Sequence, residues 1–232
     1  MDKRNDFTEC SHNVSINHCS FIDIRSDDNG GSIFLNTIHL GIEIMDSVLI
    51  RSHSWGHGGG IYAFSMYFDL NRVCFHSCSS YATHAFFSEV SMKSTVMRSL
   101  NKTSISCCIK SVSGGSFVSK NYGRNTNNDM NMSSSETSSV DAFFVDESKG
   151  YDSDRCTFAG CVGDRLLCFY SKQSNDANLN SWNVCNNSKY LKMGLFRANA
   201  QTTCANCVFI KNRYPILCES SDLDANSSVF FD

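Results

Sequence analysis

Two neighbouring carboxylates and a glycine-flanked histidine are the residues best suited to chemistry. Asp27 and Asp28 are adjacent, and His57 lies between two glycines in Gly56-His57-Gly58. Inverting hydrolysis of a glycosidic bond needs a carboxylic acid that protonates the leaving oxygen and a carboxylate that activates water, and a nearby histidine can tune both. Asp-Asp-Asn-Gly-Gly is also ordinary turn chemistry, so the same residues fit a purely structural turn.

The 13 cysteines form a second group of reactive side chains. Cys204 and Cys207 have the C-x2-C spacing of a zinc or redox motif, but a structural zinc site needs a second pair, and a thioredoxin-type role needs a βαβ context. We therefore expect neither a metal nor a cofactor. Cys107 and Cys108 cannot both point inward from one strand, so one of them should face solvent or a loop.

A calcium site is the third chemical alternative. Binding of Ca²⁺ requires six to eight oxygen ligands around one point, and nothing in the sequence fixes such an arrangement. We expect solvated carboxylates in turns instead. The acidic residues concerned are Asp141, Asp146, Glu147, Asp152 and Asp154.

The composition limits both the structure and the partners of the chain. A length of 232 residues with 41% hydrophobic residues supplies material for a real core, and a net charge of −3 without a basic cluster argues against nucleic-acid binding. The longest apolar stretches have about five residues, whereas a membrane span needs about 20. The segment Met1–Asp6 lacks the apolar region of a signal peptide. The sequence therefore predicts no membrane span and leaves the localisation open.

Frequent short turns are indicated by one proline and by Ser plus Asn at about a quarter of all positions. Between these turns, a short apolar strand recurs at intervals of about 24 to 32 residues. A second motif alternates with it and brings cysteine close to phenylalanine. The copies of the first motif begin at Ser32, Gly60, His84, Ser116, Asp141, Arg165, Tyr190 and Pro215, and those of the second are Cys19-Ser-Phe21, Cys74-Phe75, Cys156-Thr-Phe158 and Cys207-Val-Phe209, with Ser47-Val-Leu49 and Trp182-Asn-Val184 in equivalent places.

The repeat length selects the fold. No window keeps the apolar spacing of an amphipathic helix, so helix content should be very low. Propeller blades need about 40 residues and sandwiches show no fixed period, whereas a turn of a parallel β-helix takes roughly 20 to 30. We predict an all-β, right-handed parallel β-helix of seven to eight turns with a period of about 25 residues. Equivalent residues then stack, and the cysteines become small interior residues beside layers of phenylalanine.

One domain should span residues 1–232. Residues 1–13 are polar and are expected to cap the amino end, and residues 121–139 are expected to form a polar loop insertion or a degenerate turn. The apolar strand at Ser228–Asp232 is expected to promote end-to-end self-association.

Two short motifs resemble those of polymorphic outer-membrane-protein-type repeats. Gly30-Gly31-Ser32-Ile33 and Gly59-Gly60-Ile61-Tyr62 are similar to the GGAI signature, and Phe209-Ile-Lys-Asn212 is similar to FxxN. Phe75-His-Ser-Cys78 and Phe158-Ala-Gly-Cys161 place cysteine at the Asn position. The resemblance covers about six turns and implies a pectin-lyase-like fold at a cell surface, with adhesion or host contact as its role.

The Asp-Asp and Gly-His-Gly elements also resemble motifs of the polygalacturonase family, which shares this fold. Aligning the glycine motifs with an offset of 28 residues stacks His57 on Asn29, one turn from Asp28. This sequence lacks the Asn-Thr-Asp before the acidic pair and the Arg-Ile-Lys after the histidine. The resemblance implies a polysaccharide hydrolase or lyase that uses Asp27, Asp28 and His57.

We expect a non-catalytic recognition or adhesion protein in preference to an enzyme. Solvent-facing aromatic residues would contact a glycan or a host or cell-surface protein. The candidates are Trp55, Tyr62, Tyr67 and Tyr81. The enzyme alternative predicts carboxylates with raised pKa values in a groove.

Overall fold

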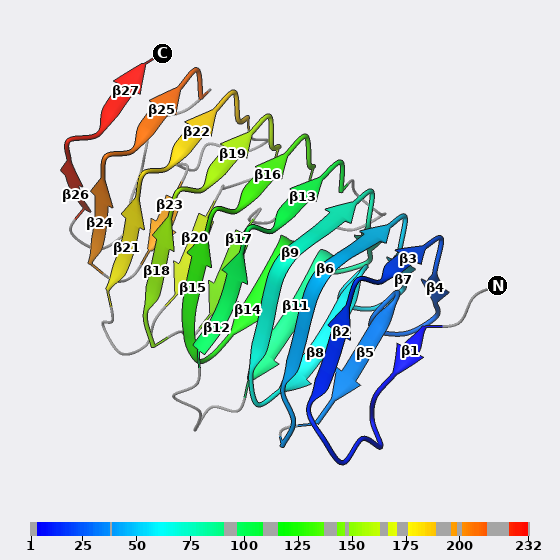
Figure 1. Ribbon diagram of the computed structural model, residues 1–232. Coiled ribbons are helices and arrows are strands. Elements are labelled where there is room, and N and C mark those ends of the chain that lie inside the picture. Colours follow the sequence, from blue (N-terminus) through cyan, green and yellow to red (C-terminus); the bar gives the residue numbers. More distant parts are fainter. Residues whose placement is uncertain are drawn as a thin grey trace.

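The computed structural model shows a parallel β-solenoid, in which the chain coils repeatedly around one core (Figure 1). It describes residues 4–37, 39–90, 97–108, 116–136, 143–146, 149–162, 167–170, 176–188, 196–198, 201–212 and 223–231. No helix occurs in these ranges, and all pairings between strands are parallel. The period is about 26 residues, and the parallel solenoid confirms the predicted fold class.

Each turn contributes strands to several faces of the coil. Face one is an eight-stranded sheet in which the apolar strands of successive turns pair side by side. Its members are β1 (Asn5–Asp6), β5 (Ile33–Asn36), β8 (Ile61–Ser65), β11 (Thr83–Val90), β14 (Ser116–Asn121), β17 (Phe143–Asp146), β20 (Leu167–Tyr170) and β23 (Phe196–Ala198). The first six predicted strands therefore lie in one sheet, while the segments that begin at Tyr190 and Pro215 lie outside the described residues.

A 16-stranded sheet bends along its length into two further faces. The strands β6 (Ile42–Ile50) and β9 (Phe68–His76) run through the bend and belong to both faces. Face two also contains β2 (Val14–Asn17), β12 (Met97–Asn101), β15 (Arg124–Asn128), β18 (Tyr151–Asp154), β21 (Ala177–Asn180), β24 (Thr202–Ala205) and β26 (Leu223–Asn226). Face three also contains β3 (Ser20–Ile22), β13 (Ser104–Ser106), β16 (Asn131–Ser133), β19 (Thr157–Ala159), β22 (Asn183–Cys185), β25 (Val208–Ile210) and β27 (Val229–Phe231).

A small three-stranded sheet completes the first turns. It consists of β4 (Arg25–Ser26), β7 (His53–Ser54) and β10 (Ser79–Ser80). After each of these strands the chain turns into face one, and glycines allow the turns to stack closely. A Cβ atom on Gly31 would lie 1.9 Å from the carbonyl oxygen of Gly59, so only glycine fits at that position.

Two rows of left-handed residues form the corners of the coil. The first corner lies between faces two and three and comprises nine residues with φ between 47° and 55°: His18, Asp46, Arg72, Lys102, Asp129, Arg155, Ser181, Asn206 and Ser227. The second corner follows face three, with φ between 46° and 62°: Asp23, Arg51, Ser77, Cys107, Ser134, Gly160, Asn186 and Lys211. Asp, Asn and Gly favour this conformation, whereas Arg and Lys adopt it because stacked neighbours fix the backbone.

The core is a set of stacked apolar rows. On face three, the parallel register places the following residues one above another inside the coil: Phe21, Leu49, Phe75, Ile105, Met132, Phe158, Val184, Phe209 and Phe230. Phe158 packs on the fully buried Trp182, with ring centroids 4.6 Å apart. The stacking predicted from the Cys–Phe motif is thus confirmed, except that Val73 and not Cys74 occupies the place equivalent to Ser47.

Cysteine, serine, threonine and asparagine line the interior directly after the corners. The serine, threonine and cysteine side chains donate hydrogen bonds to backbone carbonyl groups two residues earlier, as Ser47 Oγ does to Met45 at 2.6 Å and Cys207 Sγ to Ala205 at 3.3 Å. A thiol replaces a hydroxyl here because it is small and can still donate weakly. No disulfide links the 11 cysteines that the structure describes. Of the adjacent pair, Cys108 is buried and Cys107 is partly exposed at the corner, as predicted.

The polar stretch at 121–139 contributes strands to the coil. Within it, β15 pairs with β12 and β18, and β16 pairs with β13 and β19. Asn125 and Asn127 point inward and are fully buried, and the amide of Asn127 donates to the hydroxyl of Tyr151 at 2.5 Å. In the described positions, the stretch is therefore a turn of the coil with polar residues inside, and it does not protrude as a loop.

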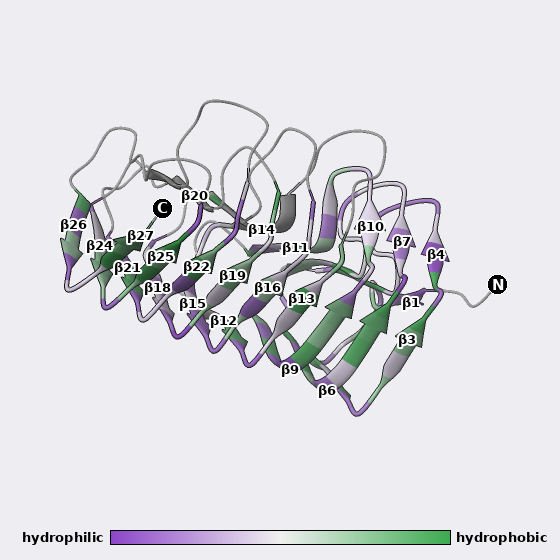
Figure 2. Ribbon diagram, turned by 90° about the horizontal axis from the view of Figure 1, so that it is seen from above, coloured by the Kyte–Doolittle hydropathy of each residue, from purple (hydrophilic) through white to green (hydrophobic). Residues whose placement is uncertain are grey.

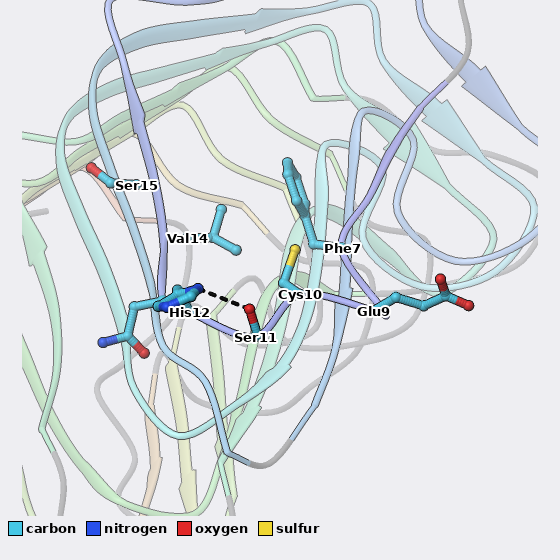
Figure 3. A pocket seen from close by; sticks show the side chains of 8 residues that line it. Phe7, Glu9, Cys10, Ser11, His12, Val14 and Ser15 are labelled. Carbon is cyan, nitrogen blue, oxygen red and sulfur yellow. Dashed lines mark hydrogen bonds between the residues drawn. The ribbon is translucent and has the colours of Figure 1, made fainter.

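The amino end already belongs to the coil. Asn5 and Asp6 pair with face one, and Phe7 packs against the core. Phe7 and residues 9–15 then line a hollow of about 440 Å³. Figure 3 shows Phe7, Cys10 and Val14 on its wall, with Ser11 Oγ bonded to Nδ1 of His12 at 2.8 Å.

Candidate functional site

The residues expected to act chemically or to contact a ligand gather where the small sheet turns into face one. Asp27, Trp55 and Tyr81 directly follow β4, β7 and β10, so they occupy equivalent places in three successive turns. We call these three residues the ridge. Trp55 is 63% exposed and Tyr81 is 53% exposed. A large aromatic side chain is usually buried, so two exposed rings one strand spacing apart are an unusual feature of this surface.

Trp55 is held by a hydrogen-bonded histidine. The ring of His53 meets the indole edge to face, with centroids 5.4 Å apart and an interplanar angle of 86°. Nδ1 of His53 lies 2.9 Å from the hydroxyl of Ser79 in the next turn. Partial burial and the nearby Arg25 lower the pKa of His53, so the ring stays neutral at physiological pH. The indole is therefore fixed in a defined direction before any ligand arrives.

The turn that carries Tyr81 is tied to a buried histidine. The backbone N–H of Ser80 donates to Nδ1 of His84 at 3.3 Å, and that of Thr83 donates to Oγ of Ser80 at 2.7 Å. His84 is fully buried, and desolvation lowers its pKa to about 4. These hydrogen bonds fix the backbone of the turn that carries the exposed Tyr81.

His57 stacks on Asn29 as the 28-residue offset predicts. The backbone N–H of His57 donates to Oδ1 of Asn29 at 2.7 Å, and the backbone N–H of Gly30 donates to the carbonyl of His57 at 2.8 Å. The imidazole itself lies against Phe87, with centroids 4.9 Å apart, and Nδ1 is 3.3 Å from Oγ1 of Thr83. Burial of the ring lowers its pKa.

Asp27 and Asp28 are exposed in the turn before the ridge aromatics. The backbone N–H of Asp28 donates to Oγ of Ser26, which is the hydrogen bond of an ordinary serine turn. Burial raises the pKa of the Tyr62 hydroxyl, and the negative charges of Glu89 and Asp28 raise it further. The structure thus brings Asp28 and His57 to one corner of the coil, in adjacent turns. The catalytic role of Asp27, Asp28 and His57 stays a prediction.

The other two aromatic candidates lie in less open positions. Tyr62 is the middle ring of an outer row on face one, 5.3 Å from Phe34 and 5.1 Å from Phe87, and the guanidinium of Arg4 covers Phe34. The ring of Tyr67 lies over Gly41, where a Cβ atom would approach to 2.0 Å. The sequence alone could not show which of the four aromatic rings are packed and which are exposed. The exposure of each ring depends on the corner of the coil at which its strand ends.

The described part of the chain holds no cluster of three or more His, Cys, Asp or Glu side chains that could ligate a metal. Cys204 and Cys207 are both buried, and a hydrogen bond between their side chains lowers the pKa of Cys207 to about 7. Asp152 accepts hydrogen bonds from Arg124 and from Asn178, and Asp154 accepts one from Asn180. These carboxylates are therefore engaged by neighbours. Asp141 and Glu147 lie outside the described residues, and the side chain of Asp146 is also undescribed.

Comparisons with known proteins do not extend this description. No protein-family model, no curated protein and no solved structure matches the chain. Among the described residues, no helix has the length and the apolar character needed to cross a membrane. The described residues form a parallel β-solenoid and contain no helix, and the first three turns carry the ridge.

Proposed function

We propose that this protein is a non-catalytic recognition protein that binds a glycan through the ridge. The observation that carries the proposal is the outward pair of Trp55 and Tyr81, which are the most exposed aromatic side chains in the first three turns. Flat aromatic rings bind the C–H faces of sugar rings, and their amphipathic edges tolerate surrounding water. His53 packs against the Trp55 indole, and the Ser80–His84 hydrogen bond fixes the backbone next to Tyr81, which reduces the ordering entropy lost on binding.

The short motifs support a relation to GGAI/FxxN repeat surface proteins of the pectin-lyase-like fold. Asn212 donates to the carbonyl of Val184 at 2.8 Å and accepts from the backbone N–H of Asn187 at 3.1 Å, so the Asn of FxxN caps the second corner. Cys78 and Cys161 occupy the same interior row. On this proposal, the protein acts in adhesion or contact at a cell surface or outside the cell. Glycans, rather than host proteins, are the partner we propose.

The test is binding to an array of soluble glycans by the wild-type chain and by Trp55→Ala and Tyr81→Ala. We expect binding that falls at least tenfold in each variant, with Tyr67→Phe as a matched control that binds like the wild type. Absence of binding to every glycan would overturn the proposal.

The enzyme alternative is tested in the same preparation by release of reducing sugar from oligogalacturonides. The proposal predicts no release. Release that disappears in His57→Ala and in Asp28→Ala would replace it with a polysaccharide hydrolase, because both residues would then be needed for turnover.

A further inference from the structure

Among the described residues, the outward positions of face three carry one histidine, His76, and no Asp, Glu, Lys or Arg side chain. The burial pattern alternates along its strands, so the outward residues can be assigned directly. From the first to the last strand the outward pairs are Ser20 and Ile22, Val48 and Ile50, Cys74 and His76, Ser104 and Ser106, Asn131 and Ser133, Thr157 and Ala159, Asn183 and Cys185, Val208 and Ile210, and Val229 and Phe231. In Figure 2 these strands form one row along the coil.

The polar groups of this face are open to a ligand. Within the described residues, the only hydrogen bond between two of these outward side chains joins Nδ1 of His76 and Oγ of Ser106, at 2.9 Å. In the part of the chain that the structure describes, the side-chain hydroxyl and amide groups of Asn131, Thr157 and Asn183 have no hydrogen-bond partner. A row of unpaired donors and acceptors that alternates with aliphatic side chains suits a ligand with both hydroxyl groups and C–H faces.

The dimensions of the face argue against a stable protein interface. Nine strands at a spacing of about 4.8 Å give a length of about 40 Å, and two outward positions per strand give a width of about 10 Å. One side of a standard protein–protein interface is about 800 Å², roughly twice this area. A repeating ligand compensates for the small area, because equal contacts recur at every turn and their effects accumulate.

We propose that face three docks onto the surface of an insoluble, uncharged polysaccharide. Each turn presents a small polar or aliphatic pair to the hydroxyl groups and C–H faces of an ordered array of sugar chains. The absence of carboxylates and cations matches a neutral polymer, since a charged one would require opposite charges on the face. This docking is separate from the ridge, which lies on a different side of the coil and takes single glycan chains.

Retention of the purified chain on microcrystalline cellulose and on crystalline chitin tests this proposal. We expect retention of the wild type on at least one solid, with less than a twofold change between 50 and 500 mM NaCl. Retention on neither solid, or retention that salt abolishes, would overturn the proposal.

Charge placed in the middle of the face gives the sharper test. Thr157→Lys and Asn131→Lys should each weaken retention at least tenfold, because a lysine there must be desolvated against a neutral surface. Thr126→Lys on face two is the matched control and should bind like the wild type. Equal retention by Thr157→Lys and Thr126→Lys, both folded by circular dichroism, would contradict the assignment to face three.

Trp55→Ala separates this docking from the proposed function. That variant should lose binding to soluble glycans and keep retention on the solid. Loss of both activities would assign the solid surface to the ridge and would overturn the docking role of face three.

Discussion

Faces two and three come from the same sheet and the same turns, yet their outward surfaces differ in chemistry. On face two, Oγ of Ser99 donates to Asp69 at 2.8 Å, and the amide of Asn178 donates to Asp152 at 2.9 Å. On face three the described outward side chains include no Asp, Glu, Lys or Arg, and the only hydrogen bond between two of them joins His76 and Ser106. Polar side chains of face two thus pair with one another across neighbouring strands. Most described polar side chains of face three have no such partner, which is why we propose that they bind a ligand.

Charged side chains occur on face two and at the corner between faces two and three. The outward residues of this corner include the ion pairs Arg72–Asp46 and Arg155–Asp129, with N···O distances of 2.5 and 2.7 Å. Exposed ion pairs of this kind contribute little to the free energy of folding. Each pair joins two adjacent turns at the corner. Charges thus line the edge of face three without entering it.

The largest difference in unfolding free energy should be between substitutions on the inward and outward sides of one strand of face three. Phe158→Ala removes a buried ring that packs on Trp182, and it should lower the free energy of unfolding by about 3 to 5 kcal/mol. Thr157→Ala on the outward side should change it by less than about 0.5 kcal/mol. Urea unfolding followed by tryptophan fluorescence measures both. Similar losses would mean that the outward side of face three is not open.

Acid should lower the stability of the fold through groups that lie outside face three. Burial lowers the pKa of His84 to about 4, so the folded protein holds this ring neutral. The stability that depends on the neutral ring is fully present above about pH 6.5 and is lost as the pH falls toward 4. The free energy of unfolding should decrease by about 3 kcal/mol over this range. Urea unfolding at pH 7.5 and pH 4.5 should show this loss. In His84→Asn, whose Oδ1 can accept the Ser80 N–H without titrating, most of the pH dependence should disappear. An unchanged dependence would assign the acid sensitivity to other groups.

Below pH 4, protonation of a carboxylate on face two should lower the stability further. The pKa of Asp152 is lowered because hydrogen bonds from Asn178 and Arg124 outweigh the effect of burial, which raises it. A carboxylate with a lowered pKa contributes stability above its unfolded value that is lost as the pH falls through its folded value. In Asp152→Asn, unfolding should therefore depend less on pH between 4 and 2 than in the wild type. Equal slopes would show that this carboxylate is not stabilised by its partners.

The smallest contrast concerns two asparagines of the same turn. Asn178 on face two donates to Asp152, while Asn183 on face three has no such partner. Asn178→Ala should cost about 1 kcal/mol, and Asn183→Ala should cost less than about 0.5 kcal/mol. Chemical denaturation of the two variants in parallel resolves the difference. Equal costs would weaken the distinction between the two faces.

The fold could be predicted because a solenoid repeats its signal in every turn. Six of the eight apolar strands that the motif predicts lie in face one, and the inward residues of the Cys–Phe motif stack on face three. Residues 121–139 were harder to assign, since the buried Asn125 and Asn127 carry no apolar alternation. Asn127 instead donates an interior hydrogen bond to the hydroxyl of Tyr151, and a hydropathy pattern does not show such a bond.

The candidate site was only partly predictable. The 28-residue offset correctly placed His57 on Asn29, because glycines fix the turn at one place in each repeat. The sequence could not show that Trp55 and Tyr81 follow equivalent strands or that face three lacks charge, because both depend on the registers of all turns together. Register across many strands is a property of the whole coil.

Native cysteines provide the most direct test of the account. Cys185 lies outward on face three, and Cys10 is exposed at the amino end, away from that face. The measurement is the alkylation rate of each thiol, by mass spectrometry, with and without the crystalline polysaccharide that retains the chain. Docking through face three predicts at least a tenfold slower reaction of Cys185 on the solid and an unchanged reaction of Cys10. Equal rates for Cys185 in the free and retained protein would contradict it.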